Sequence, residues 1–75
     1  MKESEIENIC FYLCYFAESP LKDKVESIEK FIKKSFEIST KANWEEIGQY
    51  FEEVIMSENS RLQWVLEIIN NNIKG

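Results

Sequence analysis

Hydrophobic residues recur along almost the whole chain at intervals of three and four, the spacing of one face of an α-helix. The pattern predicts four helices, over residues 4–18, 20–37, 43–56 and 60–74. No stretch alternates apolar and polar residues as a half-buried strand does. The connections between these ranges are short, so successive helices should pack as neighbours. We therefore expect a single all-α domain over residues 1–75, a small four-helix bundle with antiparallel or orthogonal packing and no sheet.

Local signals place the ends of these helices. Ser4 and Glu7 have the spacing of a capping box, in which side chains bond the free amides of a first turn, and Asn43 begins a second such pair. Pro20 ends the first helix, because it lacks an N–H and its ring clashes with the preceding turn, and it is favoured at the start of the second. Residues 38–42 lose the pattern, so we expect the longest loop there.

One stripe of each helix is expected to form the core. Gly48 interrupts the third stripe, where a missing side chain lets another helix approach closely. The expected core residues are Ile6, Ile9, Cys10, Leu13, Phe16 and Ala17, then Leu21, Val25, Ile28, Ile32, Ser35 and Phe36, then Trp44, Ile47, Phe51, Val54 and Ile55, and finally Leu62, Val65, Leu66, Ile69 and Ile73.

Composition excludes several classes of function. The chain has 14 acidic and 9 basic residues and no histidine, so its net charge is −5. This acidic balance argues against a nucleic-acid partner, because binding to phosphates needs a positive surface. Without histidine the chain lacks the commonest general base and metal ligand, and its two glycines form no phosphate-binding loop. We therefore expect no enzyme, no cofactor and no metal.

The location is inferred from the apolar runs and the cysteines. The longest apolar run, residues 9–17, is far shorter than the roughly 20 residues of a membrane span, and the acidic start is unlike a signal peptide. Cys10 and Cys14 lie four apart on one helix, a poor geometry for a disulfide. Two thiolates leave a zinc shell incomplete, so small buried side chains are favoured over half of a shared metal site. We expect a soluble, cytoplasmic protein without a membrane partner.

The first helix is apolar on nearly all sides between residues 9 and 17. With its core face centred on Leu13, a turn of 100° per residue places Phe11 and Tyr15 on the far side and Tyr12 at one edge. Such a helix is either central in the fold or covered by a partner. The three aromatic residues are therefore candidates for a contact surface.

The third helix carries the most concentrated charge. Residues 42–60 hold five glutamates and no basic residue, so this segment alone accounts for the net charge of −5. Five polar residues share an arc of about 120° opposite its core stripe. Such a face is either merely solvated or complementary to a basic partner, since its like charges have no lysines to offset them. The five are Glu45, Glu46, Gln49, Glu52 and Glu53.

Two hypotheses for function follow. The first is a small acidic inhibitor that uses both candidate surfaces to occlude a basic protein partner, such as a nuclease toxin. In size, charge and helical character the chain is similar to bacterial immunity proteins and phage-encoded inhibitors. The alternative is a self-associating structural or adaptor module, a homodimer with its seam on the first helix.

Overall fold

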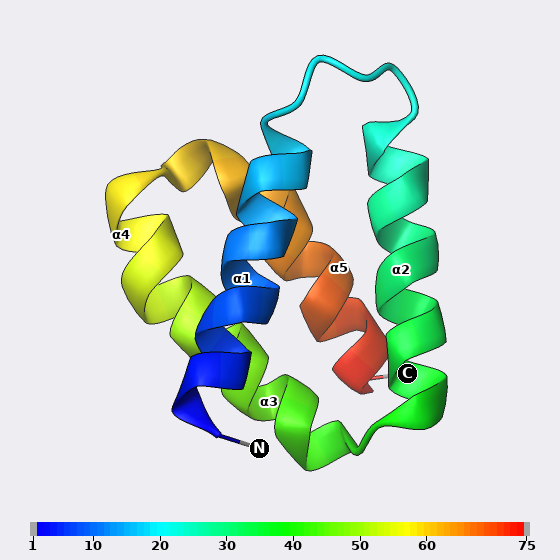
Figure 1. Cartoon of the computed structure of the whole chain (residues 1–75), viewed down its shortest axis with the longest axis vertical. Helices are drawn as coiled ribbons and strands as arrows, with labels where there is room; N and C mark the ends of the chain where they lie inside the picture. Colours follow the sequence, from blue (N-terminus) through cyan, green and yellow to red (C-terminus); the bar gives the residue numbers. More distant parts are fainter. Residues whose placement is uncertain (1, 75) are drawn as a thin grey trace.

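The computed structural model describes residues 2–74 and confirms the all-α, four-helix fold. It is 86% helical, and residues 2–74 contain no strand. The chain forms α1 (Glu3–Ala17) and α2 (Lys24–Ile38), and then α3 (Lys41–Tyr50), which continues through a π-helical turn (Phe51–Ile55) into α4 (Met56–Glu58). A 3₁₀ turn (Ser60–Leu62) leads into α5 (Gln63–Lys74) (Figure 1).

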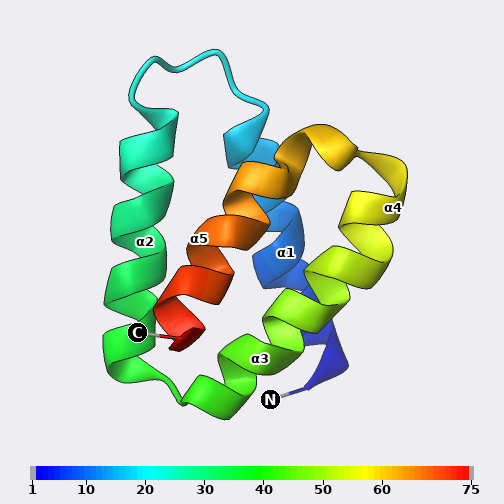
Figure 2. The same ribbon diagram turned by 180° about the vertical axis from the view of Figure 1, so that it is seen from behind.

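The helices form two layers. α1 and α2 run side by side in opposite directions and form the face seen in Figure 1. Figure 2 shows the opposite face, where the continuous α3–α4 rod and α5 lie in front. α1 packs mainly on α3, while α5 packs on both α2 and α3. The molecule measures 30 × 24 × 20 Å, and buried residues of α1, α2, α3, the π turn and α5 form one core cluster.

The core lies between the two layers and is apolar. Leu13 of α1, Ile32 of α2, Ile47 of α3, Phe51 of the π turn and Ile69 of α5 are all inaccessible to solvent. Among residues 2–74, no polar or charged residue is classed as buried. The four helices are therefore held together by the burial of apolar surface, which stabilises the fold by about 25 cal/mol for each Å² removed from water.

The start of α2 differs from the prediction. α2 begins at Lys24, not at residue 20, so the longest connection in the described chain is residues 18–23. Leu21 therefore lies outside the helix and is 51% exposed, and Val25 in the first turn of α2 is 45% exposed. Both were expected in the core, and both expectations are wrong. Leu21 precedes the helix, which starts three residues later, and Val25 is only the second residue of that helix.

The connection between α2 and α3 is shorter than predicted. α2 continues to Ile38 and α3 begins at Lys41, so the expected loop over residues 38–42 shrinks to two residues. Thr40 caps α3 by accepting a 3.2 Å hydrogen bond from the Asn43 amide, so the helix starts before Asn43. The Trp44 indole N–H donates to the Ser39 hydroxyl at 2.7 Å, which ties this short connection to the core.

The start of α1 also lacks the expected cap. Lys2 occupies the N-cap position, and α1 has no side-chain hydrogen bond there, so the capping box of Ser4 and Glu7 does not form. The helix begins one residue earlier than predicted, with Glu3 and Glu5 in its first turn. Acidic side chains near a helix N-terminus interact favourably with the helix dipole, which offsets the missing cap.

The π turn changes the register of the third helix. The Met56 amide donates to the Phe51 carbonyl, five residues back, which widens the turn. Phe51 and Ile55 stay buried, but Val54 is 38% exposed instead of belonging to the core as expected. The helical rod also continues two residues past the predicted end at residue 56, to Glu58.

Gly48 lies against α5, as its position on the core stripe suggested. A methyl group added there would sit 3.4 Å from Cγ2 of Ile69 and 3.8 Å from Cδ1 of Ile73. These are contact distances, so α5 packs directly on the backbone of α3 at this point.

Candidate protein-binding surface

The other helices leave one face of α1 open. Phe11 and Tyr12 are about half exposed, and Tyr15 is 82% exposed. α1 packs on α3 and α2, and its buried residues lie along one stripe only. Of the two alternatives for this helix, a fully enclosed position is therefore excluded. The three aromatic side chains are available to a partner.

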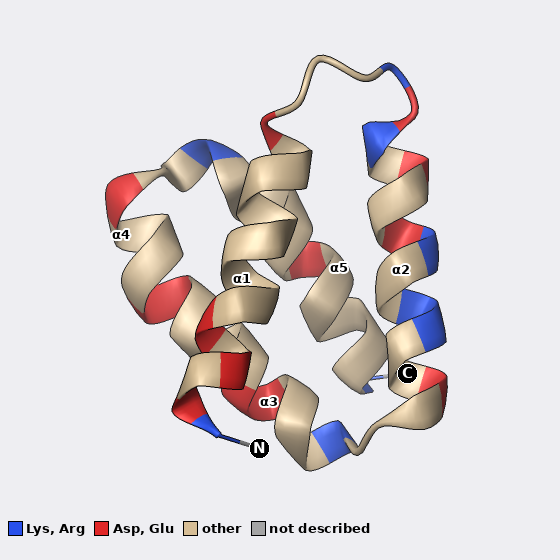
Figure 3. Ribbon diagram, viewed as in Figure 1, with Lys and Arg blue, Asp and Glu red and all other residues tan. Residues whose placement is uncertain are grey.

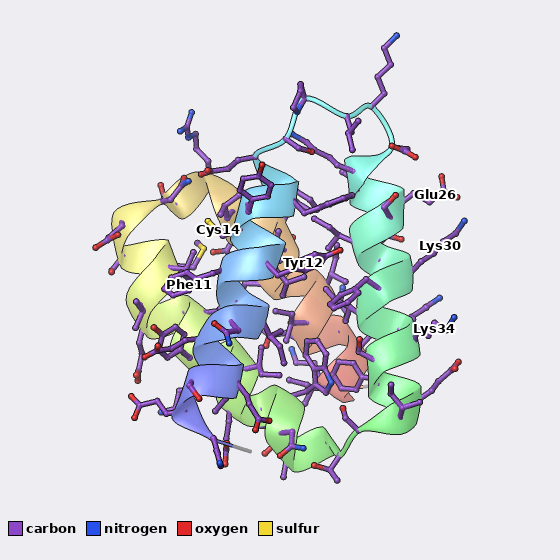
Figure 4. The ribbon with its side chains drawn as sticks, in the orientation of Figure 1. Phe11, Tyr12, Cys14, Glu26, Lys30 and Lys34 are labelled. Carbon is purple, nitrogen blue, oxygen red and sulfur yellow. The ribbon has the colours of Figure 1, made fainter. Side chains whose placement is uncertain are left out.

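These aromatic residues do not form a single patch. Figure 4 shows Phe11 pointing to the α4 side of α1 and Tyr12 pointing toward α2. The Tyr12 ring lies 5.0 Å from the ring of Phe31 in α2 and 6.1 Å from that of Phe16. Tyr12, Phe16 and Phe31 thus form an aromatic cluster between α1 and α2, whereas Phe11 belongs to the other side of the helix.

The side of α1 that faces α3 is acidic. Glu3, Glu7, Phe11 and Glu18 recur at intervals of four or seven residues, which places them on one stripe of the helix. Tyr50 of α3 lies close to this stripe: burial raises its pKa, and the charges of Glu7 and Glu3 raise it further. A negative charge on Tyr50 is therefore disfavoured, and its phenol stays neutral between these carboxylates.

The five polar residues predicted to share one face of the third helix are all exposed, three of them on α3 and two in the π turn. The amide nitrogen of Gln49 donates to the Glu53 carboxylate at 3.3 Å. Within residues 2–74 the one ion pair joins Lys30 to Glu26, both on α2, at 3.1 Å. None of the carboxylates on α3 or the π turn thus has a basic partner. The outer face comprises Glu45, Glu46, Gln49, Glu52 and Glu53.

We call these five residues, with Glu3 and Glu7 of α1, the acidic side. Segments 1–20 and 42–60 carry charges of −3 and −5, which gives −8 for the half of the molecule that contains α1 and α3. Segments 21–41 and 61–75 carry +2 and +1, which gives +3 for the half that contains α2 and α5. Figure 3 shows mainly acidic positions on α1, α3 and α4, with one lysine at the start of α3, whereas α2 carries both lysines and glutamates. The net charge is thus separated in space.

The two cysteines lie in different environments. The Cys10 thiol is buried and points at the Ile47 carbonyl at 3.6 Å. Burial raises the pKa of Cys10 to about 12, with a further contribution from Cys14. Cys14 is half-buried, and its pKa is also raised, first by burial and then by Glu18. Cys10 is fully buried within the core cluster, where it packs as a small apolar side chain. Residues 2–74 contain no group of three or more side chains placed to hold a metal ion.

Two depressions of the surface lie beside residues of α1. One, of about 440 Å³, lies at the end of the bundle, where Asn59 donates to the Glu18 carboxylate and Lys24 donates to the Ser19 carbonyl at 3.2 Å. Its charged groups thus already have partners within the chain, apart from Arg61, which forms no ion pair in the described residues. The second, of about 210 Å³, is an apolar groove lined by Ile9, Phe31, Ser35, Ile38, Ser39, Trp44 and Ile47.

Sequence reasoning missed part of these surfaces. Glu3 and Glu7 were detectable, because they precede Phe11 at intervals of four on one helix stripe. The position of Tyr50 beside these residues was not detectable, since only the packing of α3 on α1 brings it close to Glu7. The groove at Ile38 was not detectable either, because Ile38 was expected in a loop.

No helix in the described part of the chain is both long and apolar enough to cross a membrane. The chain matches no family model, no curated protein and no solved structure. The proposed function therefore depends on the surface of the molecule alone.

Proposed function

We propose that this protein is a small acidic inhibitor that binds one basic protein partner and occludes its functional cleft. The observation that supports this function is the acidic side, where carboxylates of two adjacent helices have no basic partner within residues 2–74. Crowded like charges cost a few tenths of a kcal/mol per pair, so a surface that retains them is suited to an oppositely charged molecule. A basic nuclease toxin has the required surface chemistry.

Charge and apolar contact have separate roles in this proposal. The carboxylates accelerate association and select a basic partner, and this effect weakens as salt rises. Phe11 lies on the same stripe as Glu7, and Tyr15 projects beside it with 82% exposure. Burying such aromatic side chains at the centre of an interface supplies most of the affinity. Tyr12 lies at the edge of this surface, on the side toward α2.

The π turn supports the acidic side as a binding surface. Glu52 and Glu53 lie within the π turn itself, between the buried Phe51 and Ile55. π turns are rare and frequently occur at functional sites, because they interrupt the regular hydrogen-bond ladder of a helix. Here the buried flanking residues hold the turn in place while the two carboxylates face solvent. Occlusion needs no catalytic group, in keeping with the similarity in size and charge to immunity proteins and phage inhibitors.

The test compares two charge-reversal variants with the same net charge. The double variant Glu52→Lys/Glu53→Lys changes the acidic side. The control, Glu29→Lys/Glu37→Lys, reverses two exposed glutamates on α2. Each variant and the wild-type protein are immobilised and used to capture proteins from cells that carry the gene. The captured protein is identified, purified and assayed for its own activity with and without each variant.

The proposal expects a protein with a basic surface that binds the wild type and the α2 control. The acidic-side variant should bind it at least about tenfold more weakly, and the wild-type protein should block its activity. Affinity for the wild type should also fall as salt rises. Equal binding of all three proteins, or an affinity that does not change with salt, would contradict the proposal.

A further inference from the structure

The depression at the end of the bundle joins three elements that lie far apart in the sequence. Its volume of about 440 Å³ falls within the roughly 300–1,000 Å³ that is typical of small-molecule sites. Glu18 after the end of α1, Lys24 at the start of α2 and Arg61 in the 3₁₀ turn all line it. Figures 1 and 2 both show the 18–23 connection and the start of α5 toward the same end of the molecule. We call this depression the end pocket.

Hydrogen bonds within the chain fix the walls of the end pocket. The Asn59 side-chain nitrogen donates to the Glu18 carboxylate, and its side-chain oxygen accepts from the Arg61 amide at 3.2 Å. Asn59 therefore joins the end of α1 to the start of α5. The Lys24 ammonium donates to the Ser19 carbonyl at 3.2 Å, which holds the start of α2 against the connection. The pocket is thus built by contacts between helices that are distant in sequence.

The end pocket offers more hydrogen-bond donors than the chain itself uses. The Arg61 guanidinium has five N–H groups and forms no ion pair within residues 2–74. Lys24 has three N–H groups, and the Ser19 carbonyl accepts from one of them. Next to Glu18 in the chain, the Ser19 hydroxyl is also buried without a hydrogen-bond partner in residues 2–74. A ligand that fits this pocket must therefore supply acceptors.

The charges that line the end pocket differ in sign from the molecule as a whole. Lys24 and Arg61 contribute +2 and Glu18 contributes −1, which gives +1 in a chain of net charge −5. This balance favours a ligand with one negative charge. A doubly charged phosphate is disfavoured, because the Glu18 carboxylate repels the second charge.

The surroundings of the end pocket preserve this balance. In the connection, the exposed Lys22 and Asp23 offset each other, and the exposed Glu58 does not line the pocket. The 3₁₀ turn and α5 form one helical run over residues 60–74, and its N-terminal end lies at the pocket. The helix dipole there favours a negative charge, and it adds to the attraction of the two cations.

The remaining wall of the end pocket is apolar. It consists of the buried Ala17 and Leu62 and the half-buried Trp64. Arg61 and Trp64 are three residues apart on one helical run, so both face the same side. A guanidinium binds a carboxylate through two parallel N–H···O bonds, and an indole packs against an aromatic or aliphatic group. The pocket thus matches a small molecule with a carboxylate on an apolar body.

We propose that the end pocket binds a small organic acid. The carboxylate lies against Arg61 and Lys24, and the aromatic or aliphatic body of the ligand packs on Trp64. None of the lining residues belongs to the acidic side, so the site is independent of the basic partner.

The test is an NMR titration with phenylacetate as the probe, to about 10 mM. The chain has two tryptophans, so the spectrum contains two indole N–H signals. The Trp64 signal should shift along a saturating curve with a Kd of about 1 mM or tighter. The Trp44 signal should not shift, because this indole is 2% exposed and donates to Ser39 outside the pocket. Phenylacetamide, which has the same shape without the charge, and inorganic phosphate should each bind at least about tenfold more weakly.

Two variants with the same net charge test the role of Arg61. Arg61→Gln should weaken phenylacetate binding at least about tenfold, because it removes the charged fork that holds the carboxylate. Lys22→Gln removes an exposed cation of the connection that does not line the pocket, and its affinity should stay within about twofold of the wild type. Far-UV circular dichroism checks that both variants remain helical.

Three results would overturn the proposal. They are a Trp64 signal that does not move up to about 10 mM phenylacetate, a folded Arg61→Gln variant that binds like the wild type, and binding of phenylacetamide or phosphate as tight as that of phenylacetate. Glu52→Lys/Glu53→Lys should bind phenylacetate like the wild type. Failure of this site and failure of the proposed function are therefore separate results.

Discussion

The two sides of α1 carry different chemistry although they belong to one apolar stretch of sequence. Toward α3 the helix presents Glu3, Glu7 and Phe11, beside a Tyr50 phenol whose pKa is raised by burial and by these carboxylates. Toward α2 it presents Tyr12 and Phe16, whose rings pack with Phe31. One side is thus suited to a basic molecule and the other to an apolar surface.

This difference means that the exposed aromatic residues of α1 cannot be treated as one site. Phe11 and Tyr12 are adjacent in sequence and equally exposed, but about 100° apart around the helix. Binding on the acidic side should respond to salt, because it depends on exposed charges. The contact between Tyr12 and Phe31 on the other side should be insensitive to salt, because it depends on the loss of apolar surface from water.

The largest effect is expected for the residue that supports both sides. Leu13 lies beneath them and is fully buried, so Leu13→Ala should lower the free energy of unfolding by about 2–5 kcal/mol, through lost burial and the cavity left behind. Urea denaturation followed by circular dichroism measures this change. Tyr15→Ala, at an 82% exposed position of the same helix, serves as the control and should stay within about 0.5 kcal/mol of the wild type. Similar losses of unfolding free energy for both variants would show that Leu13 does not anchor α1 in the core.

A smaller effect should separate the two aromatic neighbours. Tyr12→Ala is expected to cost about 1 kcal/mol more than Phe11→Ala, because only Tyr12 loses ring contacts with Phe16 and Phe31. A double-mutant cycle between Tyr12→Ala and Phe31→Leu should give a coupling energy of about 0.5–1.5 kcal/mol. Denaturation of the dilute protein gives both values. Equal losses for the two single variants, with no coupling, would contradict the division of the helix into two sides.

The smallest expected effect is a difference in the rate at which the two cysteines are alkylated. Cys14 is half-buried and should react with iodoacetamide before Cys10, which is fully buried and whose pKa is raised to about 12. At pH 9 an unfolded cysteine is about three quarters ionised, whereas folded Cys10 remains a thiol and does not react. Mass spectrometry of digested protein after timed labelling distinguishes the two sites. The folded Cys14→Ser variant should stay unlabelled. Rapid labelling of Cys10 in that variant would show that Cys10 is accessible to solvent.

Much of the fold was predictable because its signals are local or periodic. The spacing of apolar residues predicts all four helices and the all-α class, and it identifies Leu13, Ile32 and Phe51 as core residues. The acidic face of the third helix was predictable for the same reason, since a regular turn places its glutamates opposite the core stripe. Helix ends were less predictable, because α3 begins at a Thr40 cap and α2 begins four residues later than Pro20 suggests.

The sequence by itself determined the helices, the core stripes and the concentration of negative charge in residues 42–60, since each depends on residue types at a short, regular spacing. Only the tertiary structure decided which side of α1 faces α3 and which faces α2. It also placed Glu7 and Glu3 beside Tyr50 and exposed Val54 at a π turn. These features depend on contacts between segments far apart in the chain, and the packing of one helix against another selects them.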